Sequence, residues 1–204
     1  MMKILLGSVV SFVLVTAGSS LECEVCSGLG TSCVGKMQAC EAGKDTCIIV
    51  LAENTLAGYS LQTINKGCGS SSVCHHGPNY SNFGQGKVLR SSTTCCVGDA
   101  CRTAHPQLPP AVTRPNGKQC PACYAVSPST CNDNETVDCA GPEDNCLDLA
   151  LTITYGTFLV QTAQKGCASE SACRELRRGE SNTADVHIDV TKAECTVASL
   201  PRPG

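Results

Sequence analysis

Alternating apolar and polar positions are the clearest structural signal in this chain. In residues 147–154 the apolar positions are Leu147, Leu149, Leu151 and Ile153, with small or polar residues between them. A period of two places the apolar side chains on one face of a half-buried strand. Tyr155-Gly156 is the predicted turn, and the returning strand carries Phe158, Val160 and Thr162. Together these residues predict a β-hairpin.

The same pattern occurs in two other places. Residues 48–52 form an outgoing strand, residues 54–58 turn, and the returning strand places Tyr59, Leu61 and Thr63 on one face. Near the C-terminus Val186, Ile188 and Val190 alternate with polar residues. No segment has an apolar stripe with the 3.6-residue period of a helix. The predicted fold class is all-β.

The first 20 residues have the features of a secretion signal. Lys3 precedes the apolar run of residues 4–15, which is too short to span a bilayer, and small residues follow it. We predict a signal peptide over residues 1–20 and a mature chain that begins at Leu21. No later apolar run is long enough to span a bilayer, and the C-terminus has no hydrophobic tail for a lipid anchor. The prediction is a secreted, extracellular protein without a membrane anchor.

The cysteine content restricts the fold further. All 18 cysteines follow the predicted signal peptide, and an even number in an exported chain predicts nine disulfides in a small disulfide-rich fold. The chain has no tryptophan and few aromatic residues, so its modules bury little apolar area and need covalent cross-links, each contributing roughly 2–4 kcal/mol. The net charge of −3 argues against a nucleic-acid partner, because phosphate binding needs a concentrated basic surface.

The cysteine spacing repeats along the chain. Residues 66–74 read KGCGSSSVC, and residues 165–173 read KGCASESAC, 99 positions later. Eight cysteines occur in the same order in both halves, with gaps that differ by one residue at most. The chain is therefore predicted to be a tandem duplication of one cross-linked module. Spacing alone leaves the pairing open, since eight cysteines allow 105 connectivities.

The ten cysteines from Cys23 to Cys101 resemble the Ly-6/urokinase-receptor domain, with Cys-x2-Cys at the start and Cys-Cys-x4-Cys at the end. The resemblance implies two tandem three-finger domains of the snake-toxin-like type, residues 21–104 with five disulfides and residues 120–204 with four. The implied pairs are Cys23–Cys47, Cys26–Cys33, Cys40–Cys68, Cys74–Cys95, Cys96–Cys101, Cys120–Cys146, Cys123–Cys131, Cys139–Cys167 and Cys173–Cys195. The second copy lacks the final Cys-Cys-x4-Cys, and Arg102 stands where the family usually has Asn.

Short sequence words narrow the resemblance. LECEVC at Leu21, NKGC at Asn65, RPNG before Cys120, KGCASES at Lys165 and ECT at Glu194 are similar to gamma-type phospholipase A2 inhibitors of snake plasma and their vertebrate homologues. The resemblance covers the whole mature chain. It implies a non-enzymatic protein that binds secreted phospholipase A2 and assembles into homo- or hetero-oligomers. Sodefrin-precursor-like courtship proteins share the two-domain layout, so the alternative is a secreted signal that acts on a receptor. The source tissue would separate the two.

The sequence offers no arrangement of residues for catalysis or metal binding. It has no Gly-x-Ser-x-Gly elbow, no metal-binding histidine pair and no Gly-rich phosphate loop. Each cysteine of the two Cys-x2-Cys pairs has a disulfide partner in the framework. His75 and His76 are adjacent, so they would point to opposite sides of a strand and chelate poorly. We therefore expect no enzyme activity, no cofactor and no metal.

A proline-rich segment, residues 105–119, is the predicted linker, and its prolines make it extended and semi-rigid. Leu108 and Val112 are apolar, with little core expected beneath them. The segment is either a stiff spacer or a preordered contact strip that loses little entropy on binding. In the inhibitors that the chain resembles, the matching segment is implicated in enzyme contact. That implies partner-binding roles for Pro106, Leu108, Pro109, Pro110, Pro115, Asn116 and Gly117.

Two sequons are candidate glycan sites, and the finger tips are candidate contacts for a partner. Asn79 and Asn134 begin the sequons, both are predicted to lie in loops, and both are expected to carry glycans. Finger tips are further candidate contacts, because loops on a rigid scaffold vary and bind. Residues 174–178 place three arginines at the start of the third finger of the second copy. The favoured interpretation of these arginines is a solvated charge run.

Overall fold

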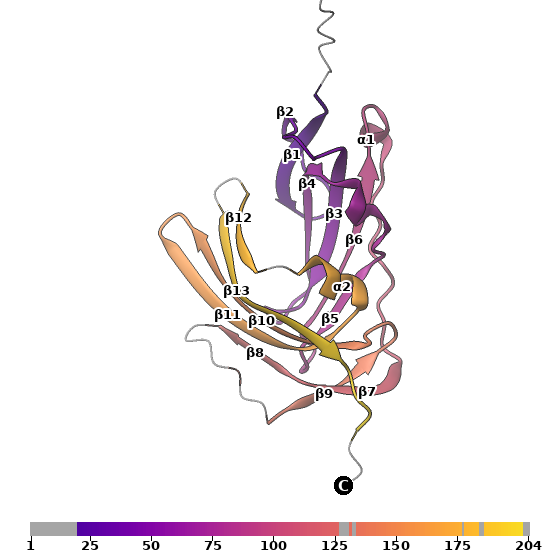
Figure 1. The fold of residues 1–204 in the computed structure, drawn as a ribbon, viewed down its shortest axis with the longest axis vertical. Helices are drawn as coiled ribbons and strands as arrows, with labels where there is room; N and C mark the ends of the chain where they lie inside the picture. The colour runs from indigo at the N-terminus through magenta and orange to yellow at the C-terminus, as the bar shows by residue number, and fades with distance from the viewer. Residues whose placement is uncertain (1–19, 127–130, 132–133, 177, 184–185, 202–204) are drawn as a thin grey trace, which may run out of the picture.

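The computed structural model describes residues 20–126, 131, 134–176, 178–183 and 186–201 (Figure 1). We call residues 20–104 module 1, residues 105–117 the strip, and residues 118–201 module 2. Module 1 contains the strands β1 (Glu22–Leu29), β2 (Lys36–Ala39), β3 (Thr46–Asn54), β4 (Leu61–Gly69), β5 (Asn79–Asn82) and β6 (Val88–Cys96). The strip ends in β7 (Pro115–Pro121), which continues into module 2. The remaining strands are β8 (Cys123–Val126), β9 (Thr136–Ala140), β10 (Asn145–Tyr155), β11 (Phe158–Ala168), β12 (Gly179–Thr183) and β13 (Val186–Val197).

Three short helical segments complete the described part of the chain. They are η1 (Ser71–His75), α1 (Ala100–Thr103) and α2 (Glu170–Glu175). The two copies of the repeated sequence word fold alike, because each ends a strand and then forms a helical turn. Ser70 caps η1 by accepting a hydrogen bond from the Ser72 amide, and Ser169 caps α2 by accepting one from the Ala172 amide. Segments this short cannot show a helical apolar stripe, which explains why the sequence pattern did not predict them.

The two modules are joined in one antiparallel sheet. Eleven strands belong to it, in the order β12-β13-β10-β11-β5-β6-β3-β4-β1-β2, with β8 also paired to β11. The junction is the pairing of β5 in module 1 with β11 in module 2, where Cys167 faces Asn82 and Ala168 faces Ser81. A second, two-stranded sheet pairs β7 with β9. The predicted all-β class is confirmed, and the shared sheet is a feature that the repeat pattern did not predict.

Nine disulfides cross-link the fold, and they are the nine pairs that the resemblance implied. No described cysteine is free. In each module two bridges hold the base of the β3–β4 or β10–β11 hairpin, because their cysteines begin the outgoing strand and end the returning strand. The hairpins therefore leave a cross-linked base as fingers.

The hydrophobic core is divided unequally between the modules. One cluster lies within module 1 and is built on Ile49, Leu51 and Ile64. A second cluster draws on both modules, since Phe83 from module 1 packs with Leu147, Leu149 and Ala168 of module 2. A third consists largely of disulfide sulfurs. Because the second cluster crosses the junction, the modules form a common core.

Candidate partner-binding surface

The strip lies against module 1, and side chains of module 1 fix its backbone. The Ser92 hydroxyl donates a hydrogen bond to the Gln107 carbonyl (2.5 Å). The Arg90 guanidinium donates to the Pro109 carbonyl (2.7 Å) and also pairs with Glu53. Proline has no amide hydrogen, so its carbonyl is the main-chain group left to bond. These contacts hold the strip in one extended path, which runs down the right-hand side of Figure 1 from α1 to β7.

The apolar residues of the strip face inward, contrary to the expectation that little core lies beneath them. Leu108 packs against the cluster of Ile49, Leu51 and Ile64, and Pro109 is buried. Val112 lies over Gly141, where an added Cβ would come within 2.3 Å of a Val112 methyl group. The strip therefore completes the core of module 1 before it reaches module 2.

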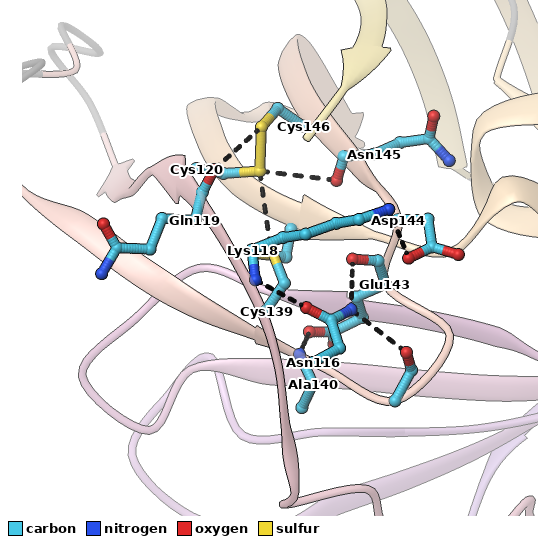
Figure 2. A network of polar contacts seen from close by, with 12 residues as sticks. Asn116, Lys118, Gln119, Cys120, Cys139, Ala140, Glu143, Asp144, Asn145 and Cys146 are labelled. Carbon is cyan, nitrogen blue, oxygen red and sulfur yellow. Dashed lines mark hydrogen bonds and ion pairs between the residues drawn. A yellow bond between two sulfur atoms is a disulfide. The ribbon is translucent and has the colours of Figure 1, made fainter. Parts of the chain in front are cut away.

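Asn116 connects the strip to module 2 through a polar network (Figure 2). Its side-chain amide donates to the carbonyls of Gly141 and Glu143, both at 3.1 Å, and its side-chain oxygen accepts from the Lys118 amide. The Arg114 carbonyl accepts a hydrogen bond from the Gly141 amide. Asn116 therefore has a structural role, because its polar side-chain atoms bond within the chain.

Glu143 is the unusual titratable group of this network. Its side chain is 5% exposed, and one carboxyl oxygen accepts a hydrogen bond from the Ala140 amide at 2.8 Å. Burial raises the pKa of the Glu143 carboxyl to about 7, although the amide hydrogen bond acts in the opposite direction. The charged neighbours Lys118 and Asp144 pair with each other at 2.9 Å. Glu143 thus supports the turn that receives the strip.

The seven predicted strip residues divide by exposure. Pro110, Pro115 and Gly117 are exposed, Pro106, Leu108 and Asn116 are half-buried, and Pro109 is buried. Between them Ala111, Thr113 and Arg114 are exposed as well. The surface that a partner could touch is therefore the outer edge of residues 110–117, and the inner residues hold that edge in place.

The fingers offer a second surface, which the sequence interpretation named only in general terms. At the tip of the β10–β11 hairpin, Phe158 is 73% exposed and Leu159 is 59% exposed. Residues 149–164 contain no charged side chain, and this run is the sequence signal that could have identified the finger. The tip projects to the left in Figure 1, away from module 1.

The predicted arginine run lies on a solvated, ion-paired surface. Arg174 pairs with Glu170, and Arg178 pairs with Glu194. The third arginine of the run, Arg177, lies outside the described residues. The described members have acidic partners within module 2, as a solvated charge run would.

The sequon at Asn79 does not lie in an exposed loop. Asn79 belongs to β5, is 8% exposed, and donates its side-chain amide to the Glu175 carboxylate of module 2 (2.7 Å) and to the Ser91 hydroxyl. The prediction of a loop site is wrong here, because the atom that would carry a glycan lies inside the junction of the modules. Asn134 is exposed, beside the surface hollow lined by Phe83, Tyr124 and Glu135.

Potential metal ligands among the described residues gather in two places, Cys23-Cys40-Cys68 and Cys120-Cys139-Cys167. All six of these cysteines form disulfides, so their sulfurs are not thiolate ligands. His75 and His76 lie at the end of η1, where His76 is 3.8 Å from the Glu175 carboxylate. In the described part of the chain, no helix is both long and apolar enough to cross a membrane.

Two family models match this chain, one over each module. The family model for phospholipase A2 inhibitors matches residues 21–103, and the model for the u-PAR/Ly-6 domain matches residues 116–199. A solved structure, mouse TEX101, matches with a TM-score of 0.36 at 18% identity, covering 86% of this chain and 99% of that one.

Curated relatives match nearly the full chain. Phospholipase A2 inhibitor NAI of Notechis ater is 36% identical over 187 residues, covering 91% of this chain and 90% of the relative. The phospholipase A2 inhibitor 25 kDa subunit of Naja kaouthia is 35% identical over 188 residues, covering 90% of this chain and 97% of the relative. Phospholipase A2 inhibitor PIP of Malayopython reticulatus is 32% identical over 199 residues, covering 93% of each chain. With a family model matching each module and relatives matching nearly the full chain, the chain belongs to the phospholipase A2 inhibitor family of two-domain u-PAR/Ly-6 proteins.

Proposed function

We propose that this protein is a secreted inhibitor that binds a secreted phospholipase A2 and has no catalytic activity of its own. The observation that carries the proposal is the nearly full-length match to proteins named phospholipase A2 inhibitors. The inferred mechanism is steric, because the protein covers the face through which the enzyme receives aggregated lipid. No bond is made or broken by this chain.

The structure of the strip supports this mechanism. Its backbone is held by Ser92 and Arg90, and its inner residues Leu108 and Pro109 are packed on module 1. A segment that is ordered before binding loses little conformational entropy when a partner arrives. The outer edge of residues 110–117 is therefore suited to contact an enzyme surface, together with the exposed finger tip.

The test is a titration of the folded chain into secreted phospholipases A2 that hydrolyse mixed micelles, with direct binding measured in parallel. The expected result is saturable inhibition at a defined molar ratio. Well-folded protein without free thiols that neither binds nor inhibits several such enzymes would contradict the proposal.

Single substitutions then test the strip. Arg114→Ala at the outer edge should weaken binding, whereas Arg102→Ala, an exposed arginine of module 1 outside the strip, should leave it unchanged. Pro109→Ala is expected to act through stability instead, because Pro109 is buried. Equal effects of Arg114→Ala and Arg102→Ala on binding would argue against the strip.

We also propose self-association, which the family resemblance implies. Light scattering at micromolar concentration should give a mass above that of one chain. A clean monomer under these conditions would end this part of the proposal and leave the binding proposal intact.

A further inference from the structure

One face of the module 2 sheet becomes apolar toward the tips of its fingers, beyond the buried polar residues Thr162 and Gln164 of β11. In the register of the sheet, Ile153 on β10 lies between Val160 on β11 and Ile188 on β13. Phe158 lies on the same face as Val160, two residues closer to the tip. On β8, Val126 stands opposite Thr162, the next residue of β11 on this face. We call Val126, Ile153, Phe158, Val160 and Ile188 the outer face.

A β-bulge keeps this face apolar. The register between β10 and β13 shifts between Ala150 and Leu151, so that Leu151 faces Val190 and Ile153 faces Ile188. Without the extra residue, Leu151 would face Thr191 and Ile153 would face Asp189. Bulges re-aim side chains in this way. The bulge thus places aliphatic residues of β13 beside those of β10 up to the tip.

The outer face is continuous with apolar residues that are buried in the contact between the two modules. Leu147 and Leu149 lie on the same side of β10 and are buried against Phe83 of module 1 and Ala172 of α2. Further out the covering ends, and the exposed fractions rise to 38% for Val160 and 73% for Phe158. The same apolar surface is therefore covered by module 1 at its base and open toward the tip.

The equivalent finger of module 1 has a similar face that is interrupted by a polar residue. Because the gaps are equal, Tyr59 corresponds to Phe158, but Asn54 stands at the position of Ile153. Glu53 beside it pairs with Arg90, and Leu56 packs into the shared core. The equivalent face of module 1 thus keeps the exposed side chains of Leu29 and Tyr59, and the polar Asn54 interrupts it.

We propose that the outer face binds the apolar rim around the lipid-access opening of a secreted phospholipase A2. This inference rests on the proposed function. An enzyme that draws single phospholipids from an aggregate presents apolar surface to the acyl chains. The outer face matches such a rim in polarity, because residues 149–164 carry no charged side chain.

Two other occupants fit the surface less well. Binding to an anionic membrane would need basic residues around the patch. The nearby Lys165 and Lys192 instead lie on the opposite side of the sheet, with Asp148 between them. A second copy that paired through this face would meet the same five side chains, fewer than the roughly 20–30 residues a side of a stable interface, whereas an enzyme can also contact the outer edge of the strip. A small apolar anchor is typical of the centre of a larger footprint on another protein.

The experiment compares three single variants of the full mature chain in enzyme binding. Phe158→Ser removes the most exposed side chain of the outer face and should raise Kd at least tenfold, as expected for an interface anchor. Leu159→Ser changes the neighbouring residue on the other side of the sheet and should stay within about twofold, the size of a contact outside the anchor. Tyr59→Ser, at the equivalent position of module 1, should also stay within about twofold.

Each outcome decides the proposal. If the wild-type chain binds and Phe158→Ser binds equally well, the outer face is not the contact. If Leu159→Ser weakens binding as much as Phe158→Ser, the tip is held on both sides and the assignment to one face is wrong. If the wild-type chain binds no enzyme, the proposed function fails, and this inference fails with it.

Two further measurements distinguish the other occupants. Wild-type and Phe158→Ser chains are sedimented with neutral phosphatidylcholine vesicles and, separately, sized by light scattering. No vesicle binding and an unchanged mass are expected. A loss of vesicle binding or of mass in Phe158→Ser, with enzyme affinity unchanged, would overturn the proposal in favour of lipid or of a second copy.

Discussion

Equivalent strands in the two modules bury opposite faces. In β3 of module 1 the buried residues are Ile49 and Leu51, each 3% exposed. In β10 of module 2 the positions that correspond to them are Asp148 and Ala150, whereas the buried residues are Leu147 and Leu149, on the other face. The cysteines that frame the two strands have the same spacing, so the cross-links do not decide which face becomes core.

The covering segment explains the difference. In module 1 the strip returns over the face of Ile49 and Leu51 and adds Leu108 to it. On the corresponding face of module 2, Asp148 pairs with Lys165 and Lys192 instead. On the opposite face of module 2, Leu147 and Leu149 are buried because Phe83 of module 1 covers them. The same disulfide framework thus buries different strand faces in the two modules, because the strip covers β3 and Phe83 covers β10.

The largest effect is expected from removing the Phe83 side chain, which tests whether the core of module 2 depends on module 1. Phe83 is 4% exposed in the shared core, so Phe83→Ala should lower the free energy of unfolding by about 3–5 kcal/mol. Amide exchange should rise in β10 of module 2 although the substitution lies in module 1, because Leu147 and Leu149 lose their cover. Ile49→Ala is the control and should raise exchange mainly in module 1. Two variants with the same exchange pattern would contradict the division of the core into these two clusters.

The next largest effect is expected at Gly166, and Gly67 is the equivalent glycine in the repeated KGC sequence of module 1. A Cβ on Gly166 would lie 2.0 Å from the Asn82 carbonyl oxygen at the β5–β11 junction, whereas a Cβ on Gly67 would meet nothing within 4 Å. Gly166→Ala should therefore destabilise by roughly 1–3 kcal/mol in urea unfolding, and Gly67→Ala should change stability by less than about 0.5 kcal/mol. Similar losses in both variants would mean that the junction is not packed this closely.

The two capping serines should differ by a smaller amount. Ser169 caps α2 and also accepts a hydrogen bond from the Tyr80 amide of module 1, while Ser70 caps η1 within module 1. Ser169→Ala removes the cap and leaves a buried amide without its partner, so it should destabilise by about 2 kcal/mol. Ser70→Ala should destabilise by about 0.5–1 kcal/mol. Thermal unfolding of the two variants side by side measures the difference, and a larger loss for Ser70→Ala would contradict the assignment.

The modules should also differ in the pH dependence of their stability. Glu143 is buried beneath the strip, whereas the corresponding Lys44 is exposed. Because the folded pKa of Glu143 is raised to about 7 from 4.5, the folded state binds more protons between these values, and stability falls as pH rises through this window. Glu143→Gln should flatten this dependence, which amounts to about 2 kcal/mol between pH 5 and 7. A wild-type stability that stays constant or rises from pH 5 to 7, with Glu143→Gln following it, would refute the pKa shift.

Local pattern predicted the elements of the sheet well. The alternation of Leu147, Leu149, Leu151 and Ile153 lies within β10, and the alternation of Val186, Ile188 and Val190 lies within β13. A period of two depends only on neighbouring residues, so it can be recognised without knowledge of the fold. The short helices have no such local signal. The exposure of Phe158 could not be predicted either, because a strand pattern does not show where other residues stop covering the strand.

Spacing along the chain was enough to specify the duplicated framework, the hairpins and, through the resemblance, the pairs of cysteines. Three-dimensional contacts were needed to establish that the modules share a sheet, that Leu108 and Pro109 face inward, and that Asn79 lies in the junction. Each of these features arises from contacts between residues far apart in the sequence, such as Asn79 with Glu175 and Gly166 with Asn82. Residue types and local periods do not specify such contacts, because the same polar or small side chain suits a surface loop and a close junction equally well.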